Sequence, residues 1–251
     1  MDPYKLIEQD IQERADKRGL HGTISHIRYF NRCLNQFIKK GKHKKALFVG
    51  VGHGHNAAIC LLDGLVEYVI GVDPYIADDG NNSEDHKKLL TIIDSCNLRE
   101  RFKVEKKTIQ SYLEDVSEDF DLIICSDVLH HIFVTEEHLS KSDLSSQAIH
   151  LFKRFSDISR DNGMLVISEV QRYGIRPFLK NAGFIKKNMD YRTKQPWVEW
   201  KKAAVEADWD FVNIRNYVPY RFREKRKVFE GILGRYTLCD KYFLYYSKKS
   251  K

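Results

Sequence analysis

The chain has 251 residues and a net charge of +7, a length at which a hydrophobic core stabilises a fold without disulfides or metal ions. Hydrophobic residues make up 42% and charged residues 31% of it, a balance typical of a globular protein rather than a disordered or fibrous one. No apolar run approaches the roughly 20 residues that cross a bilayer, so we expect no membrane span. The first residues lack the apolar core of a signal peptide. The five cysteines are scattered with no Cys-x-x-Cys pair. Together these features favour a cytoplasmic protein.

Apolar spacing predicts two helices at the start of the chain, over residues 3–18 and 23–40. From Ala46 onward, short apolar runs alternate with helical segments. The runs predicted as strands are 46–49, 68–72, 102–106, 122–125, 164–168 (after an Asn162-Gly163 turn), 211–214 and 242–246, with 236–238 a further candidate for the last strand. The segments predicted as helices are 57–62, 84–96, 144–159 and 196–207. Cys60 and Cys125 lie inside apolar runs, where we expect buried thiols.

This alternation is typical of an α/β fold with a mostly parallel sheet of about seven strands, flanked by helices, in which the last strand is antiparallel. The helical segment 1–44 precedes this domain and is a candidate lid. The domain itself spans 45–251, with an insertion after the fifth strand at 171–198 on the substrate side. Ligands of such sheets bind at the carboxyl ends of the strands, so the residues that follow each strand are the candidate site.

Three glycines at alternate positions follow the first predicted strand, in the sequence Gly50-Val51-Gly52-His53-Gly54. Glycine permits a tight turn and a close approach of the backbone to a ligand, toward which the next helix points its N–H groups. Asp73 ends the second predicted strand, where a carboxylate accepts hydrogen bonds from ribose hydroxyls. A dinucleotide site would have glycine at position 55, and this chain has His55. The pattern therefore favours an adenosine without a pyrophosphate.

In these residues the chain resembles the class I S-adenosylmethionine-dependent methyltransferases. The stretches that carry the likeness are 47–54, 71–73, 120–131 and 160–167. The resemblance implies a Rossmann-like sheet and S-adenosylmethionine as the cofactor. It implies that Gly50, Gly52 and Gly54 line the cofactor, that Asp73 holds the ribose and that Ser126 flanks the sulfonium, with Val51 and Pro74 as neighbouring contacts. The family often has an acid near the adenine after the third strand, where this chain has Thr108-Ile109, so we expect Ile109 to pack on the adenine instead. The chain departs from the family at Phe48, where an acid usually stands two residues before the first glycine.

Two histidines are candidate bases for methyl transfer to oxygen or nitrogen, because imidazole titrates near neutral pH. His130 and His131 follow the fourth predicted strand, and Asp127 is close enough in sequence to orient a histidine or the cofactor. His53 and His55 add further nitrogen ligands, and together these side chains form an alternative metal site. No ligand spacing among them is diagnostic, so we predict no metal.

The candidate substrate-binding residues are Tyr173, Arg176 and Trp197, which lie in or beside the insertion. Aromatic rings stack on sugars or bases, and arginine binds phosphate or carboxylate. We predict oxygen methylation of a small polar acceptor such as a saccharide or metabolite, and leave the oligomeric state open. One alternative is an RNA or tRNA methyltransferase, supported by the net charge of +7. The chain has no recognisable RNA-binding module, and its basic clusters at 39–45, 221–227 and 248–251 bracket the domain without forming a stripe. A second alternative is a protein that binds S-adenosylmethionine without catalysis, and a third is a reductase, which His55 opposes.

Overall fold

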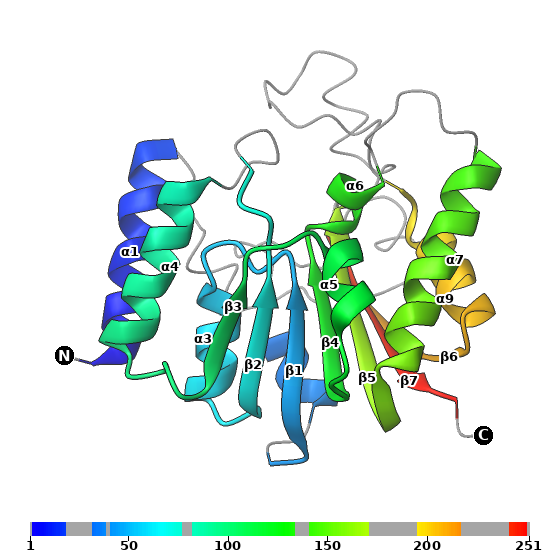
Figure 1. Cartoon of the computed structure of the whole chain (residues 1–251), viewed down its shortest axis with the longest axis horizontal. Coiled ribbons are helices and arrows are strands. Elements are labelled where there is room, and N and C mark those ends of the chain that lie inside the picture. The colour runs from blue at the N-terminus through cyan, green and yellow to red at the C-terminus, as the bar shows by residue number, and fades with distance from the viewer. Residues whose placement is uncertain are drawn as a thin grey trace. The chain divides into compact units, whose positions relative to one another are not determined.

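Strands and helices alternate along the chain in the order expected from the sequence (Figure 1). The computed structural model describes residues 2–18, 32–38, 41–76, 82–133, 141–170, 195–216 and 241–249. The strands are β1 (His43–Val49), β2 (Val66–Val72), β3 (Phe102–Glu105), β4 (Phe120–Ser126), β5 (Ser159–Val170), β6 (Trp209–Asn216) and β7 (Lys241–Lys248). The helices are α1 (Pro3–Arg18), α3 (His55–Leu62), α4 (Ser83–Ser95), α5 (Ile109–Asp115), α6 (Leu129–Ile132), α7 (Lys141–Asp157) and α9 (Trp197–Glu206).

The strands described form a 7-stranded sheet of order β3-β2-β1-β4-β5-β7-β6. β2 pairs in parallel with both β1 and β3, whereas β7 pairs antiparallel with both β5 and β6. The last four residues of β1 and of β2 are all buried, as expected for parallel strands covered on both faces. The predicted mostly parallel sheet with an antiparallel last strand is therefore confirmed.

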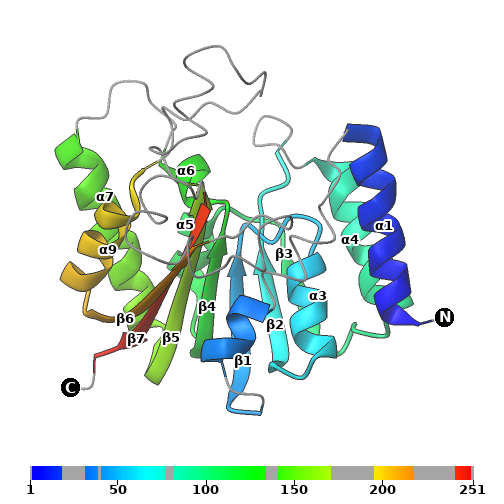
Figure 2. The same ribbon diagram turned by 180° about the vertical axis from the view of Figure 1, so that it is seen from behind.

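Residues Met1–Ile123 form one compact unit, which holds the first three strands. Within it, α1 and α4 lie side by side, and α3 and α5 lie on opposite sides of the strands (Figure 1, Figure 2). Ile7 and Ile11 bury the inner face of α1. The predicted helix 3–18 is confirmed, and 32–37 is helical within the predicted 23–40, whose other residues lie outside the described part except for 38. The role of 1–44 as a lid stays a prediction.

Residues Ile124–Lys251 form the second compact unit, in which α7 and α9 lie side by side (Figure 1, Figure 2). Trp200 of α9 is 2% exposed and its ring lies 5.6 Å from that of Phe133 and 6.3 Å from that of Phe152. The Trp209 indole N–H donates to the Phe152 carbonyl at 2.9 Å. Trp200 is therefore a core residue, which anchors α9 in this unit.

Three elements differ from the prediction. β5 begins at Ser159 and continues through Asn162, which adopts a φ of 64° inside the strand, so the predicted Asn162-Gly163 turn is wrong as a boundary. Asparagine tolerates this left-handed conformation better than most residues. The short helices α5 and α6 were not predicted, because 7 and 4 residues are too few to show a helical period.

Two expectations about buried and membrane-spanning segments have a clear outcome. Cys60 and Cys125 are both fully buried, as predicted, and burial raises the pKa of each thiol, which keeps it protonated and unreactive. Within the described ranges, no helix combines the length and apolarity needed to cross a bilayer.

Candidate cofactor and acid–base sites

The turn after β1 is shaped by glycines in the left-handed region. Gly50, Gly52 and Gly54 have φ values of 66°, 54° and 70°, which side chains with a Cβ adopt at a cost. The turn is anchored to β2, because the N–H groups of Gly50 and Val51 both donate to the Val72 carbonyl, at 2.8 and 3.2 Å. It ends at Gly54, the N-cap of α3. The sequence thus places a strand, a tight glycine turn and a helix N-terminus in succession.

Two glycines admit close packing around this turn. A Cβ on Gly54 would lie 2.2 Å from Cδ1 of Leu89, so α4 packs directly against the turn. A Cβ on Gly71 would lie 2.8 to 2.9 Å from three side-chain carbons of Val51. Val51 therefore covers the end of β2, two residues before Asp73. The predicted ligand Val51 thus has a packing role that the sequence did not reveal.

Asp73 connects the end of β2 to the glycine turn. One carboxylate oxygen accepts the Gly52 N–H and the other accepts the Tyr75 N–H, both at 3.0 Å. The Tyr75 hydroxyl donates to the Gly52 carbonyl at 2.6 Å. Burial, followed by the Asp73 and Asp85 carboxylates, raises the pKa of Tyr75, so this hydroxyl keeps its proton. Asp73, Tyr75 and Gly52 therefore form a closed set of hydrogen bonds.

These groups match the chemistry of an adenosine. Each oxygen of a carboxylate can accept a second hydrogen bond, so Asp73 can hold ribose hydroxyls while it keeps its two backbone partners. The glycine turn brings backbone close to a ligand without side chains in the way. Asp73 is 3% exposed, so its carboxylate is buried at the end of β2. The donors and acceptors fit the cofactor that the resemblance implies.

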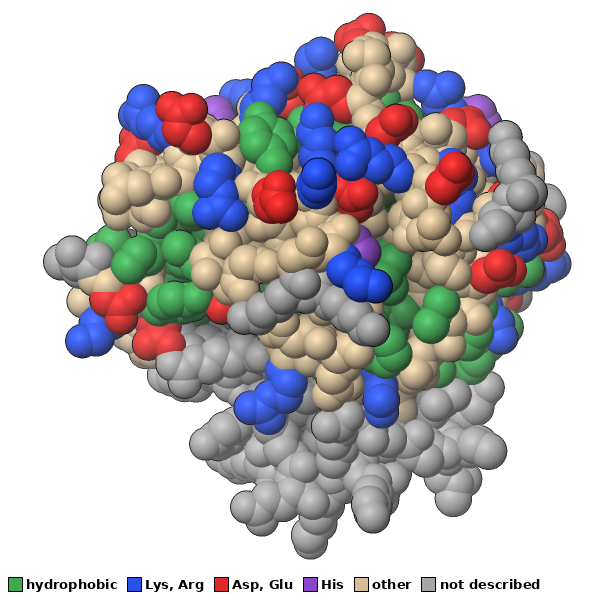
Figure 3. Space-filling model, turned by 90° about the horizontal axis from the view of Figure 1, so that it is seen from below, with side chains coloured by type: hydrophobic (Ala, Val, Ile, Leu, Met, Phe, Trp, Pro, Cys, Tyr) green, Lys and Arg blue, Asp and Glu red, His purple; other side chains and the backbone are tan. Residues whose placement is uncertain are grey.

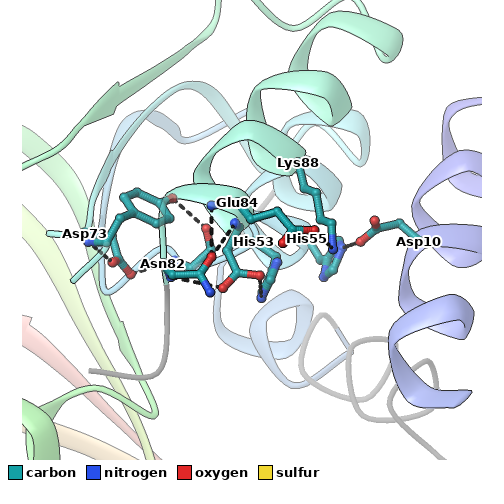
Figure 4. A network of polar contacts seen from close by, with 10 residues as sticks. Asp10, His53, His55, Asp73, Asn82, Glu84 and Lys88 are labelled. Atoms are coloured by element: carbon teal, nitrogen blue, oxygen red, sulfur yellow. Dashed lines mark hydrogen bonds and ion pairs between the residues drawn. The ribbon is translucent and has the colours of Figure 1, made fainter. Parts of the chain in front are cut away.

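His53 of the turn and His55, the first residue of α3, each lie near an aspartate of a helix (Figure 4). His55 Nε2 lies 2.7 Å from an Asp10 carboxylate oxygen, and His53 Nε2 lies 3.4 Å from one of Asp85. The two imidazoles are stacked, with ring centres 5.8 Å apart. Among the described residues, no group of three or more His, Cys, Asp or Glu side chains could hold a metal ion.

The other predicted cofactor ligands of this unit follow β2 and β3. Pro74 is half-buried directly after Asp73. Ile109 is 4% exposed and is the first residue of α5. The helix is capped by Thr108, whose Oγ1 accepts the Ser111 N–H at 3.2 Å. Contact of Pro74 or Ile109 with an adenine stays a prediction.

In the second unit, Ser126 ends β4 and Asp127 follows it with a φ of 54°. The Asp127 N–H donates to the Ser168 carbonyl at 2.7 Å, which joins this turn to β5. The Asp127 carboxylate forms an ion pair with Lys241 of β7, whose side chain is 7% exposed. Asp127 thus compensates the charge of a buried lysine, a partner 114 residues away in sequence.

His130 is held by a carboxylate that the sequence analysis missed. Glu169 of β5 is 1% exposed, and its two oxygens accept the Leu129 N–H at 2.7 Å and contact His130 Nδ1 at 2.8 Å. Because a carboxylate only accepts, the imidazole proton lies on Nδ1, which leaves Nε2 as the acceptor in the neutral ring. His131 is exposed, with its ring 4.1 Å from that of His130. The available signal was an acid directly after the apolar run 164–168.

The predicted substrate residues lie mostly beyond the described ranges. Tyr173 and Arg176 belong to the undescribed stretch 171–194, and Trp197 is the half-buried first residue of α9. Part of the first basic cluster is described. There, the Lys44 and Lys45 N–H groups donate to the Asp121 carboxylate and the Lys45 ammonium pairs with Glu118. On the face drawn in Figure 3, Lys and Arg side chains lie among Asp and Glu side chains.

No protein-family model and no curated protein sequence matches the chain. Solved structures do match. Magnesium protoporphyrin IX methyltransferase from Synechocystis, solved with bound SAH, has a TM-score of 0.57 and 10% identity, over 90% of this chain and 84% of that one. The cyclopropane synthase from Mycobacterium tuberculosis has a TM-score of 0.58 and 12% identity, over 90% and 84%. The chain has the class I methyltransferase fold.

A candidate O-methyltransferase from Nostoc punctiforme has this fold as well, with a TM-score of 0.55 and 12% identity. The match covers 89% of this chain and 56% of that one, so the chain spans little more than half of that protein. At these identities the class I methyltransferase fold is what the likeness establishes, and the chemistry has to be argued from the residues themselves.

Proposed function

We propose that the protein transfers a methyl group from S-adenosylmethionine to a hydroxyl group of a small polar acceptor, such as a saccharide or metabolite. The observation that carries this proposal is the hydrogen-bonded set at the carboxyl ends of β1 and β2. There, a three-glycine turn and a carboxylate lie within 3.0 Å of each other through Gly52 and Asp73. Backbone and carboxylate in this arrangement suit an adenosine without a pyrophosphate.

Within the first unit, Gly50, Gly52 and Gly54 would line the cofactor and Asp73 would hold its ribose hydroxyls, with Val51, Pro74 and Ile109 as apolar contacts. Ser126 of the second unit would flank the sulfonium. When bound, S-adenosylmethionine supplies a methyl group activated by its positively charged sulfur. The protein then has to bind the acceptor, orient it and remove its proton.

His130 is the residue that fits proton removal. Its Nδ1–H donates to the buried Glu169, so Nε2 can accept a proton from an acceptor hydroxyl and the resulting imidazolium is stabilised by the adjacent carboxylate. Glu169 orients the ring and keeps its tautomer, while the Leu129 N–H fixes Glu169 itself. A hydroxyl is a weak nucleophile until its proton is removed, so an oxygen acceptor needs such a base. Tyr173, Arg176 and Trp197 are proposed to bind the acceptor.

Calorimetry tests the cofactor assignment with S-adenosylmethionine, S-adenosylhomocysteine and NAD titrated in parallel. We expect both adenosyl ligands to bind, and Asp73→Asn to weaken binding by about tenfold, which is 1.4 kcal/mol. Asp94→Asn is the matched control, because Asp94 is an exposed partner of Arg99 at the end of α4. A preference for NAD would refute the proposal.

The catalytic half of the proposal needs a separate measurement. Release of S-adenosylhomocysteine is followed with a panel of polyhydroxylated small molecules. Turnover that His130→Gln abolishes, with unchanged binding of S-adenosylhomocysteine, supports His130 as the base. Tight cofactor binding without turnover across the whole panel would favour the alternative of a non-catalytic binding protein.

A further inference from the structure

Aspartates of two helices lie close to the glycine turn and the start of α3, in addition to Asp73, which directly follows β2 (Figure 4). Asp73 contacts residue 52, Asp85 of α4 contacts residue 53 and Asp10 of α1 contacts residue 55. His53 and His55 are 8% and 7% exposed, so both pairs lie inside the protein. A turn of glycines has little conformational preference of its own, so its shape depends on such contacts.

On the α4 side, the Asp85 carboxylate caps its own helix and also faces His53. One oxygen of Asp85 accepts the Asn82 N–H at 3.0 Å, and the Asn82 side chain accepts the N–H groups of Glu84 and Asp85, which completes a capping box. The other oxygen faces His53. The capping box fixes Asp85 on α4, and Leu89 of the same helix fills the space beside Gly54. The α4 side of the turn is therefore closely packed.

On the α1 side, the helix contacts α3 at both ends. The Tyr4 hydroxyl donates to Asp63, directly after α3, at 2.7 Å, and Asp10 meets His55, the first residue of α3, at 2.7 Å. Burial and the bond to Asp63 raise the pKa of Tyr4 to about 12, so its hydroxyl keeps its proton. Ile7, between the two contacts, is fully buried. Asp10 therefore links α1 to the start of α3, directly after the glycine turn.

We propose that Asp10 is a positioning residue for the cofactor, which acts through His55 to hold the glycine turn and the start of α3 in the conformation that binds the adenosine. The negative charge of Asp10 also suits the positive N-terminal end of α3, where a protonated His55 alone would be unfavourable. A turn fixed before binding loses less conformational freedom on binding, which raises affinity. The N-terminal helix thereby controls cofactor affinity, an inference that rests on the proposed function.

Calorimetric titration of the full chain with S-adenosylhomocysteine tests this role. We expect Asp10→Asn to weaken binding by about tenfold and Asp10→Glu, which keeps the charge, to restore most of it. Tyr4→Phe is the matched control, because it removes the other polar contact of α1 with α3 at the end away from the turn. We expect its affinity to stay within about twofold of wild type. His55→Gln should weaken binding as Asp10→Asn does, and the double variant should show no further loss.

A readout independent of cofactor checks the contact itself. In nitrogen-15 spectra of histidine side chains, the His55 signals should shift in Asp10→Asn and stay unchanged in Tyr4→Phe. Binding by Asp10→Asn equal to wild type would overturn this inference and leave the proposed function intact. An equal loss of affinity in Asp10→Asn and Tyr4→Phe would show a merely structural role and would also overturn it. Failure of the wild type to bind S-adenosylhomocysteine would refute both proposals.

Discussion

Glu169→Gln separates the orientation of His130 from the shape of its surroundings. Glutamine keeps the size of glutamate but offers one acceptor oxygen and an amide nitrogen that only donates. In the wild type, two donors face the carboxylate, the Leu129 N–H at 2.7 Å and His130 Nδ1 at 2.8 Å. The glutamine can satisfy one of them, and the other has to change. We expect the change at His130, because an imidazole can move its proton from Nδ1 to Nε2 and accept from the amide.

The size of the effect follows from this exchange. A buried donor left without a partner costs about 1–3 kcal/mol, so the tautomer that avoids it is favoured. Loss of the charge from two hydrogen bonds lowers the free energy of unfolding by about 1.5–3 kcal/mol. With its own proton on Nε2, His130 can no longer take a proton from the hydroxyl group of the substrate. General-base catalysis contributes about 100- to 10,000-fold, so we expect turnover to fall within that range while cofactor affinity is unchanged.

The tautomer can be measured before any acceptor is known. Two-bond nitrogen-15 spectra of histidine-labelled protein in a mildly alkaline buffer distinguish a proton on Nδ1 from one on Nε2. We expect Nδ1 for His130 in the wild type and Nε2 in Glu169→Gln. Glu206→Gln on the exposed side of α9 is the control and should leave His130 unchanged. A wild-type His130 with its proton on Nε2 would refute the reasoning, because the Glu169 oxygen that faces Nδ1 would then receive no hydrogen bond from the imidazole.

Three further predictions concern stability. Gly71→Ala places a methyl group within 2.9 Å of the stiff Val51 side chain, so we expect a loss of about 1–3 kcal/mol in urea unfolding and weaker cofactor binding; an unchanged midpoint would contradict the tight contact. Tyr75→Phe leaves the Gly52 carbonyl without its 2.6 Å donor and should cost about 1–2 kcal/mol in the same assay, whereas no loss would mean that water replaces the hydroxyl. Burial lowers the pKa of His43 below 6.5 in the folded protein. The unfolded chain then binds more protons, so the free energy of unfolding should fall as the pH drops below 6.5. His43→Gln should flatten that slope.

Features set by local sequence were predicted well. The first two strands were found because Ala46-Leu47-Phe48-Val49 and the run 68–72 are short and wholly apolar, as parallel strands buried on both faces have to be. The glycine turn was found because three glycines at alternate positions have few structural uses. Helix α4 was found from its apolar spacing, and its capping box, Asn82 with Asp85, is a further local signal.

The partners of the site residues could not be predicted, because folding selects them from distant parts of the chain. His55 is 45 residues from Asp10, and His130 is 39 residues from Glu169. Asp127 lies three residues before His130, which suggested that the two interact, yet the carboxylate that contacts His130 is Glu169 of β5. The alignment of the segment after β4 with β5 decides this, since the Asp127 N–H donates to the carbonyl of Ser168, the residue before Glu169, and no local pattern specifies a register between distant strands.

Phe48 shows that carboxylates can surround the glycine turn without an acid at the position that the family motif specifies. It stands where class I methyltransferases usually carry an acid, and in this chain it is 4% exposed and lies opposite Gly71 in the β1–β2 ladder. A carboxylate there would be buried beside apolar strands, at a cost of several kcal/mol unless a partner reached it. The carboxylates around the glycine turn come instead from β2, α4 and α1. A sequence motif that covers β1 does not include acids that other elements contribute. A motif that requires an acidic residue at position 48 therefore does not match this chain, even though the fold places three aspartates around the turn.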